Sequence, residues 1–320
     1  MAWTTADLLT EVRRLAMLPS SSNSATADSD IFAQADRAMQ ASVVPYVMAA
    51  QEEFFVRKLS VTLTAGTAMV PISRRAVGSR VRNVALVRNN SRIQLARLRI
   101  EELDRFRIVT TGAPSSFYLD AANMVLLPTP ASNDTLEVSI YCRPGVFTAS
   151  TNHRNLQSIT ADTDYLGNSA PGRTRLTWSG VLAVSTLGTP IDIISRFPPF
   201  EHKALDITYN SAGGSVSSID VATSDLLATP SILDIVCPSG ESSVVQLPVE
   251  CHPLLYQRTT QFLLEQLGYA QEANTAKDTA DRMEAALHAV LMPRTDGNPQ
   301  RLAGGALDLI QRAGFGVWRW

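Results

Sequence analysis

The stretch ECHPLLYQRTTQFLLEQLGYAQEANTAKDTADRMEAALHAVLMP, residues 250–293, decides the expected fold. Apolar residues recur near helical spacing after Pro253, whose missing N–H costs nothing at the first position of a helix. Gly268 suits the left-handed conformation in which many helices end. After it, a narrow apolar seam of small and then bulky residues continues until Pro293. We therefore predict a hairpin of two amphipathic helices.

A helical hairpin of this kind must bury its apolar seam against other helices, because it cannot be stable alone. Small residues along the seam would let a neighbouring helix approach closely. The other helical patterns lie at the N-terminus, where one helix begins at Thr4 and a longer one, interrupted at Pro45, spans 30–57. Both ends of the chain are expected to meet in one bundle. The residues predicted to pack within it, or between subunits, are Leu255, Phe262, Leu263, Ala276, Ala280, Met283 and Leu287.

At Ser60 the apolar period changes from 3.6 to 2, which predicts β-strands as far as Pro248. Asp192 and Asp234 lie 42 residues apart in matching Asp-Ile-aliphatic steps, each preceded by another short strand pattern. This similarity indicates a weak internal β repeat, although a chance match explains it nearly as well.

The expected fold class is therefore α+β, with a helical bundle formed by the N- and C-terminal helices. A large antiparallel β region would be inserted between them, and an extended arm would follow the last helix. The predicted parts are the N-terminal helices at 1–59, a first β region at 60–148, a second at 149–248, the helical hairpin at 249–293 and the C-terminal arm at 294–320.

The charge of the chain is unevenly distributed. The net charge is −2 over 320 residues, but residues 57–107 carry 12 basic and three acidic side chains, a net of +9. This stretch fits a solvated side of the strands, an interface with an acidic protein partner, or a wall passed by DNA, whose phosphates would be the anions. The arginines considered for such a face are Arg74, Arg75, Arg80, Arg82, Arg88 and Arg92.

The sequence contains no convincing catalytic constellation. Glu250, Cys251 and His252 are adjacent, but neighbouring residues rarely aim at one reacting atom, and the helix start at Pro253 explains them. Asp162 and Asp164 lie in a polar stretch without further oxygen ligands for a cation. We predict no enzyme activity, no catalytic residue, no metal and no cofactor. Since no run approaches the roughly 20 apolar residues of a membrane span, no membrane partner is expected.

The last segment, 294–320, is apolar and contains glycine and two tryptophans. Such a segment is expected to dock on its own domain or on another chain. Its apolar residues are Leu302, Leu307, Leu309, Ile310, Phe315, Val317, Trp318 and Trp320.

Several pieces of the sequence together resemble one family of phage proteins. The pieces are Ala6-Asp-Leu-Leu-Thr-Glu-Val-Arg-Arg14, Ala38-Met-Gln-Ala-Ser-Val-Val-Pro-Tyr46, Gly112-Ala-Pro-Ser-Ser-Phe-Tyr118, Asn123-Met-Val-Leu-Leu-Pro-Thr-Pro130 and His252-Pro-Leu-Leu255. In this order they resemble the head-to-tail adaptor (connector) proteins of tailed bacteriophages, and the resemblance extends over nearly the whole chain. The long β insertion departs from the simplest adaptors.

The resemblance implies a structural protein that forms a ring of twelve copies beneath the portal in the virion neck. Such a ring joins head to tail and extends the DNA channel. The implied partners are the portal protein, bound through the C-terminal arm, other copies of the chain, tail, nozzle or fibre proteins, and DNA in transit. The implied location is the virion, after synthesis in the bacterial host cytoplasm. A stopper, tail tubular or fibre-attachment protein remains an alternative, and a soluble enzyme or cellular binding module a more distant one.

Overall fold

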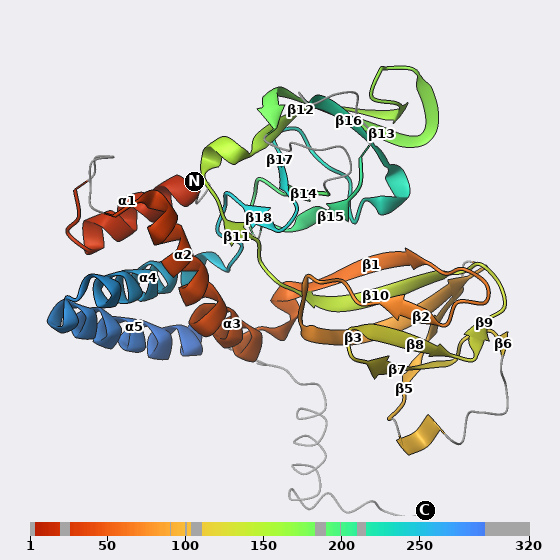
Figure 1. The fold of residues 1–320 in the computed structure, drawn as a ribbon, viewed down its shortest axis with the longest axis horizontal. Helices are drawn as coiled ribbons and strands as arrows, with labels where there is room; N and C mark the ends of the chain where they lie inside the picture. The colour runs from red at the N-terminus through yellow and green to blue at the C-terminus, as the bar shows by residue number, and fades with distance from the viewer. Residues whose placement is uncertain are drawn as a thin grey trace, which may run out of the picture.

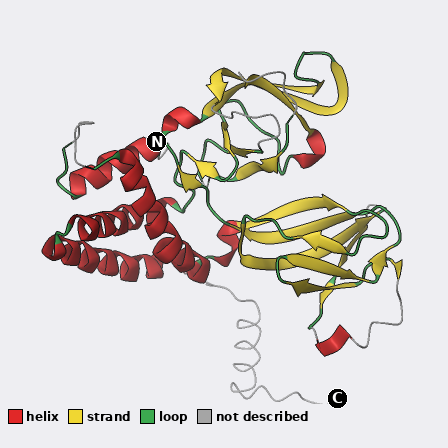
Figure 2. Cartoon of the chain, viewed as in Figure 1, coloured by secondary structure: helices red, strands yellow, loops and turns green. Residues whose placement is uncertain are grey.

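In the computed structural model, helices gather at one side of the molecule and strands form two β regions on the other (Figures 1 and 2). The structure describes residues 4–19, 26–89, 91–99, 101–103, 111–182, 190–198, 200–209 and 216–291. The predicted arm at 294–320 therefore lies outside the described residues.

The N-terminal helices begin as their sequence predicts. Helix α1 (Thr5–Leu15) starts with a capping box, in which the Thr4 hydroxyl accepts from the Asp7 N–H and the Asp7 carboxylate accepts from the Thr4 N–H. Helix α2 (Asp28–Ala38) continues through a π-helical stretch (Met39–Val43) into α3 (Val44–Ala50). Pro45 lies at the start of α3, where its missing N–H is accommodated by the wider π turn.

The C-terminal helices are α4 (His252–Leu267) and α5 (Ala270–Leu291), joined at Gly268. Gly268 has φ 84° and ψ 10°, the left-handed conformation that ends α4. Helix α4 contacts α1, α2 and α5. A single apolar core joins these helices, and it includes Leu8, Ile31, Val47, Leu255 and Leu263, all with no exposed surface.

The expected fold class is nevertheless wrong. The described structure consists mostly of β-strands arranged in several sheets, with few helices, and is not a helical bundle formed by the N- and C-terminal helices. The strands are also not all antiparallel, because three short pairs run parallel. The expectation gave the helices the defining role because long helices have an uninterrupted periodic signal, whereas these strands are short or shifted by bulges.

The first β region contains two four-stranded sheets with a shared core. One sheet has the order β1-β10-β3-β4 and the other β2-β8-β7-β5, and a short pair β6·β9 lies beside them. Their core contains Leu63, Leu86, Met124, Leu126 and Leu136. The strands are β1 (Val56–Thr62), β2 (Met69–Pro71), β3 (Ala76–Arg88), β4 (Ser91–Gln94), β5 (Ala96–Arg97), β6 (Thr111–Gly112), β7 (Ser116–Asp120), β8 (Asn123–Leu127), β9 (Thr129–Pro130) and β10 (Thr135–Cys142).

The second β region is a six-stranded sheet of order β15-β14-β17-β12-β13-β16. The two matching stretches of the sequence lie together in it, because β13 pairs with β16 and β14 pairs with β17, both antiparallel. Asp192 and Asp234, the matching acidic residues, therefore lie on or beside neighbouring strands. The strands are β12 (Arg154–Thr163), β13 (Ser169–Leu182), β14 (Ile191–Ile194), β15 (His202–Ile207), β16 (Val216–Ala222) and β17 (Ile235–Pro238).

A small parallel pair connects the second β region to the helices. Strand β11 (Val146–Phe147) pairs with β18 (Glu241–Ser242), and both lie between the helices and the six-stranded sheet (Figure 1). The Thr5 N–H donates to the Ser243 carbonyl at 2.9 Å, which holds the start of α1 against this segment. The helices, the first β region and the second β region therefore meet near residues 143–147 and 239–246.

Candidate interaction surfaces

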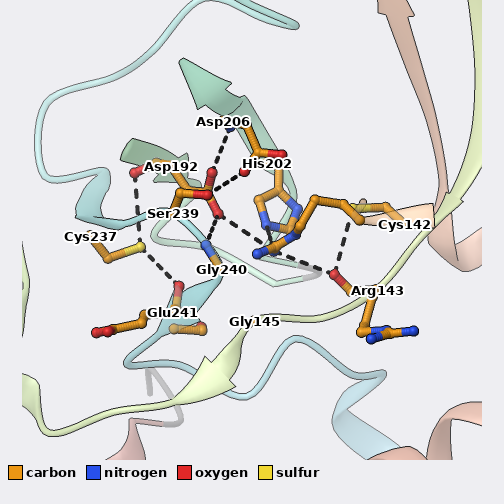
Figure 3. Close-up of polar contacts among 12 residues, drawn as sticks. Cys142, Arg143, Gly145, Asp192, His202, Asp206, Cys237, Ser239, Gly240 and Glu241 are labelled. Carbon is orange, nitrogen blue, oxygen red and sulfur yellow. Dashed lines mark hydrogen bonds and ion pairs between the residues drawn. The ribbon is translucent and has the colours of Figure 1, made fainter. Parts of the chain in front are cut away.

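A buried ion pair joins the two β regions. Arg75 precedes β3, and its Nη2 lies 3.4 Å from Oδ2 of Asp192 in β14. The Asp192 side chain is 0% exposed, and its two oxygens accept from the N–H groups of Asp206 (2.8 Å) and Gly240 (3.0 Å), as Figure 3 shows. A buried carboxylate needs such partners, because desolvation alone would cost several kcal/mol. Arg75 also donates to the Arg143 carbonyl, so one side chain contacts two distant segments.

A neutral histidine completes this junction. His202 Nε2 lies 3.3 Å from Arg75 Nη2 and 3.3 Å from Gln246 Nε2. Both neighbours are donors, so Nε2 must be the acceptor, which assigns the ring proton to Nδ1. Burial, and then the charge of Arg75, lower the pKa of His202 to about 3. Burial raises the pKa of Asp192 to about 6, and Arg75 opposes that rise. At neutral pH the junction therefore holds one anion, one cation and an uncharged ring.

Glycine is required twice where the segments approach each other. At Gly240, φ is +83° and an added Cβ would lie 2.9 Å from Arg75 Nη1. At Gly145, an added Cβ would lie 2.8 Å from the backbone of Glu241. A side chain at Gly145 would clash with this backbone, and one at Gly240 would require left-handed φ and would displace the end of the Arg75 side chain.

A cleft of about 630 Å³ separates the two β regions beside this junction. Its polar lining contains both charges on the first region and only acidic charges on the second. These residues are Lys58, Ser60, Ser73, Arg74 and Glu137 on one wall, and Asp206, Thr208, Ser224 and Asp225 on the other.

The arginines considered as a channel or acidic-partner face are mostly engaged within the chain. Arg82 pairs with Glu53, Arg88 with Asp134 at 3.6 Å and Arg92 with Glu137 at 2.7 Å. Arg80 lies over the Tyr141 ring, with its guanidinium carbon 5.1 Å from the ring centroid. Arg75 is buried in the junction, and Arg74 is exposed in the cleft wall. The structure therefore does not bring these six residues together as one free cationic face.

The predicted seam residues of the hairpin lie inside the chain. Leu255, Leu263 and Ala280 belong to the helical core with no exposed surface, and Ala276 packs in a smaller cluster with Ala273 and Leu264. Phe262, Met283 and Leu287 are partly buried against the same core. Phe262 also lies under Arg37, whose guanidinium carbon is 4.7 Å from the ring centroid.

The other candidate residues form no chemical site in the described structure. Cys251 and His252 are buried at the start of α4, where His252 Nε2 lies 3.2 Å from the Leu247 carbonyl oxygen. Asp164 organises the turn between β12 and β13 by accepting from Leu166 and Asn168. Within the described ranges no three metal-ligating side chains lie close enough to hold an ion, and no helix is long and apolar enough to span a membrane. All predicted arm residues, Leu302 to Trp320, lie outside the described ranges.

Comparison with known proteins now adds to this geometry. The sequence model of one family, described as SU10 adaptor protein, matches residues 3–170, more than half of the chain. The chain belongs to the SU10 adaptor protein family. No curated protein matches it. The adaptor is thus a structural protein of the phage-adaptor type and a virion component.

The matched part of the adaptor comprises α1 to α3, the whole first β region, β11, β12 and the beginning of β13. It contains Arg75 but neither Asp192 nor His202. The junction therefore links the matched part to strands beyond it, and the same holds for the packing of α4 and α5 against α1 and α2.

Sequence reasoning missed the partner of Arg75. A weak signal was present, because Asp192 interrupts the aliphatic run Ile191-Asp-Ile-Ile194, and a carboxylate in such a strand needs a buried donor. The strand pattern does not indicate which donor this is. Asp36 of α2 was also missed, since nothing in its sequence neighbourhood distinguishes it from a solvated helix residue.

Proposed function

We propose that this adaptor forms a ring beneath the portal, joins the phage head to the tail and extends the DNA channel. The observation that carries the proposal is the match of residues 3–170 to the adaptor family. A ring of twelve copies would fit the symmetry of a neck complex, and its contacts would be heterologous, with two different faces of each subunit meeting.

The shape of the chain supports a role in binding. The buried junction of Arg75 and Asp192 holds the β regions in a fixed relation, which suits a spacer that must keep a channel aligned. The hairpin α4–α5 exposes apolar side chains at its turn and its far end, with Leu267 36%, Tyr269 54% and Val290 64% exposed. Exposed apolar side chains of this size are typical of protein contacts.

In this proposal the segment following α5 attaches the adaptor to the portal through Leu302, Leu307, Leu309, Ile310, Phe315, Val317, Trp318 and Trp320. Two tryptophans near one end provide large apolar surface for a partner pocket. The ring would then place its β regions toward tail, nozzle or fibre proteins.

Negative-stain microscopy of the chain with the portal protein encoded by the same genome tests this function. We expect portal rings lengthened on one face, and no added density with a chain truncated after Pro299. A full-length variant with Trp318→Ser and Trp320→Ser is the matched control for chain length, and it should bind weakly. Unchanged portal rings with the full chain would overturn the portal role and favour a more distal tail component. Undiminished binding by the truncated chain would overturn the arm assignment alone.

A further inference from the structure

A groove beside α2 contains a carboxylate without a cationic partner. The groove has a volume of about 420 Å³ and lies between α2 and the segment 147–149. Its walls include Phe32, Ala33, Phe147 and Ala149, and Asp36 lies among them. The Asp36 Oδ1 accepts from the Phe147 N–H at 2.9 Å. The groove therefore combines apolar and aromatic walls with one fixed acceptor.

The charge of Asp36 is not compensated within the described part of the chain. Asp28, the other acid lining the groove, pairs with Arg13 at 2.6 Å, whereas no described basic group lies within ion-pair distance of Asp36. Burial raises the pKa of Asp36 to about 7, and the Phe147 hydrogen bond opposes that rise. A half-buried carboxylate with a free oxygen facing an apolar groove suits a planar guanidinium, which can form two parallel hydrogen bonds with the acid.

The first β region of the chain has more basic than acidic residues, whereas the helices have more acidic than basic ones. Helices α1 to α5 with their connections, residues 4–50 and 249–291, have 11 acidic and six basic residues, a net of −5, whereas the first β region, residues 56–142, has 12 basic and six acidic residues, a net of +6. In Figure 1 the β5 edge of the first β region lies far from the groove, whose walls are α2 and the segment after β11, between the helices and the second β region. Arg97 in β5 and Arg99 just after it are both exposed, and neither forms an ion pair among the described residues. Opposite charges on two different surfaces of one chain favour heterologous contact between identical chains.

We propose that the Asp36 groove of one subunit binds a guanidinium of Arg97 or Arg99 from a second copy of this chain. The contact pairs a half-buried carboxylate with a cation, and it repeats from subunit to subunit because donor and acceptor lie on different surfaces of the chain. This inference rests on the proposed function, since it assigns the surfaces through which the subunits of the ring meet.

Charge reversal in two separate chains tests the contact. The first chain carries Asp36→Arg and the second carries Arg97→Asp with Arg99→Asp. Mass photometry of each, free and with portal, should show loss of assembly, because like charges would then face each other. An equimolar mixture should assemble again with alternating chains, since every contact in it pairs opposite charges. Asp278→Arg, an equal charge change on the exposed side of α5, is the control and should assemble like the natural chain.

Asp36→Asn provides a second variant that keeps the side-chain size and the acceptor for Phe147. It should weaken assembly at least tenfold while circular dichroism and melting show a folded chain. Full assembly of Asp36→Asn and Asp36→Arg would overturn this inference, and so would a mixture that fails to restore assembly. Neither result would contradict the proposed ring itself. A natural chain that forms no ring, free or on the portal, would overturn the proposed function and the inference with it.

Discussion

Arg75 Nη2 lies 3.4 Å from Asp192 Oδ2, and this pair joins a turn of the first β region to a strand of the second. Both side chains are almost completely withdrawn from water, with 10% and 0% of their surface exposed. Further bonds from Gly240 and Asp206 satisfy the carboxylate, and the Arg143 carbonyl accepts from the guanidinium. Removing one partner would leave the other charged and buried.

Replacing Arg75 by Met is therefore expected to lower the free energy of unfolding by about 3 kcal/mol, since breaking a buried pair costs far more than removing an exposed one. Urea denaturation at pH 7 measures this change. Arg74→Met is the matched control, because Arg74 is the exposed neighbour and should shift stability by less than about 0.5 kcal/mol. Adding Asp192→Asn to Arg75→Met should recover part of the loss. Equal effects at positions 74 and 75 would contradict the structural role of the pair.

Gly240→Ala should destabilise the chain through backbone strain and through a clash with Arg75. Comparison with Gly66→Ala, which has only the backbone strain, separates the two effects. Gly240 and Gly66 have nearly equal φ, +83° and +81°, but only at Gly240 would a Cβ approach another group, Arg75 Nη1, at 2.9 Å. Each change strains the backbone by about 1 kcal/mol, and Gly240→Ala should cost roughly another 1–2 kcal/mol through displacement of Arg75. Thermal melting of both variants gives the difference. Identical losses would indicate that Arg75 moves without cost.

Asp36→Asn is expected to stabilise the free chain above neutral pH. The folded state raises the pKa of Asp36 from 3.8 to about 7, so the folded protein binds the proton more tightly than the unfolded one does. Stability from this group is therefore present at low pH and falls as the pH rises from about 4 to 7. At pH 8 we expect Asn to add roughly 1–2 kcal/mol, less than the full shift implies because water still reaches the carboxylate.

Urea denaturation of both proteins at pH 5 and pH 8 tests this expectation. The advantage of Asn should shrink at pH 5, where the natural carboxyl is already mostly protonated. A constant difference between the two proteins at both pH values would indicate that the charge of Asp36 is not the cause.

Close packing between α4 and α5 predicts that Ala280 does not tolerate a larger side chain. Ala280 has no exposed surface within the helical core, so Ala280→Leu should cost about 1–3 kcal/mol by overpacking. Ala285→Leu, on the same helix but exposed, should change stability by less than about 0.5 kcal/mol. Chemical denaturation of the two variants measures both. A tolerated Leu at position 280 would mean that the helices are free to separate.

The local features of the helices could be predicted from the sequence. Thr4 with Asp7 indicates a capping box, Pro253 a helix start and Gly268 a left-handed end, and each depends on atoms a few residues apart. The alternation beyond Ser60 likewise predicts strands. The helical bundle was wrong as the defining part of the fold, because short strands with bulges give a weaker signal than helices do and the helices therefore received too much weight.

The adaptor family could also be predicted from the sequence, because a family is recognised from the order of short sequence pieces and not from contacts between distant residues. Its ring, its portal contact and its arm remain predictions. The repeat around Asp192 and Asp234 could be noticed in the sequence, whereas the pairing of β14 with β17 could not.

Only the tertiary structure decided which charges meet. Arg82, Arg88 and Arg92 were candidates for a face toward DNA or an acidic partner, but each pairs within the chain: Glu53 lies in a 3-10 turn before β1, Asp134 just before β10 and Glu137 in β10. Asp192 reaches Arg75 only because β14 lies beside the turn before β3. Asp36 has no cationic partner among the described residues because Arg13, the base that packs against α2, pairs with Asp28 instead. Periodicity and capping depend on local spacing, which the sequence contains, whereas ion pairs and grooves depend on which distant segments become neighbours.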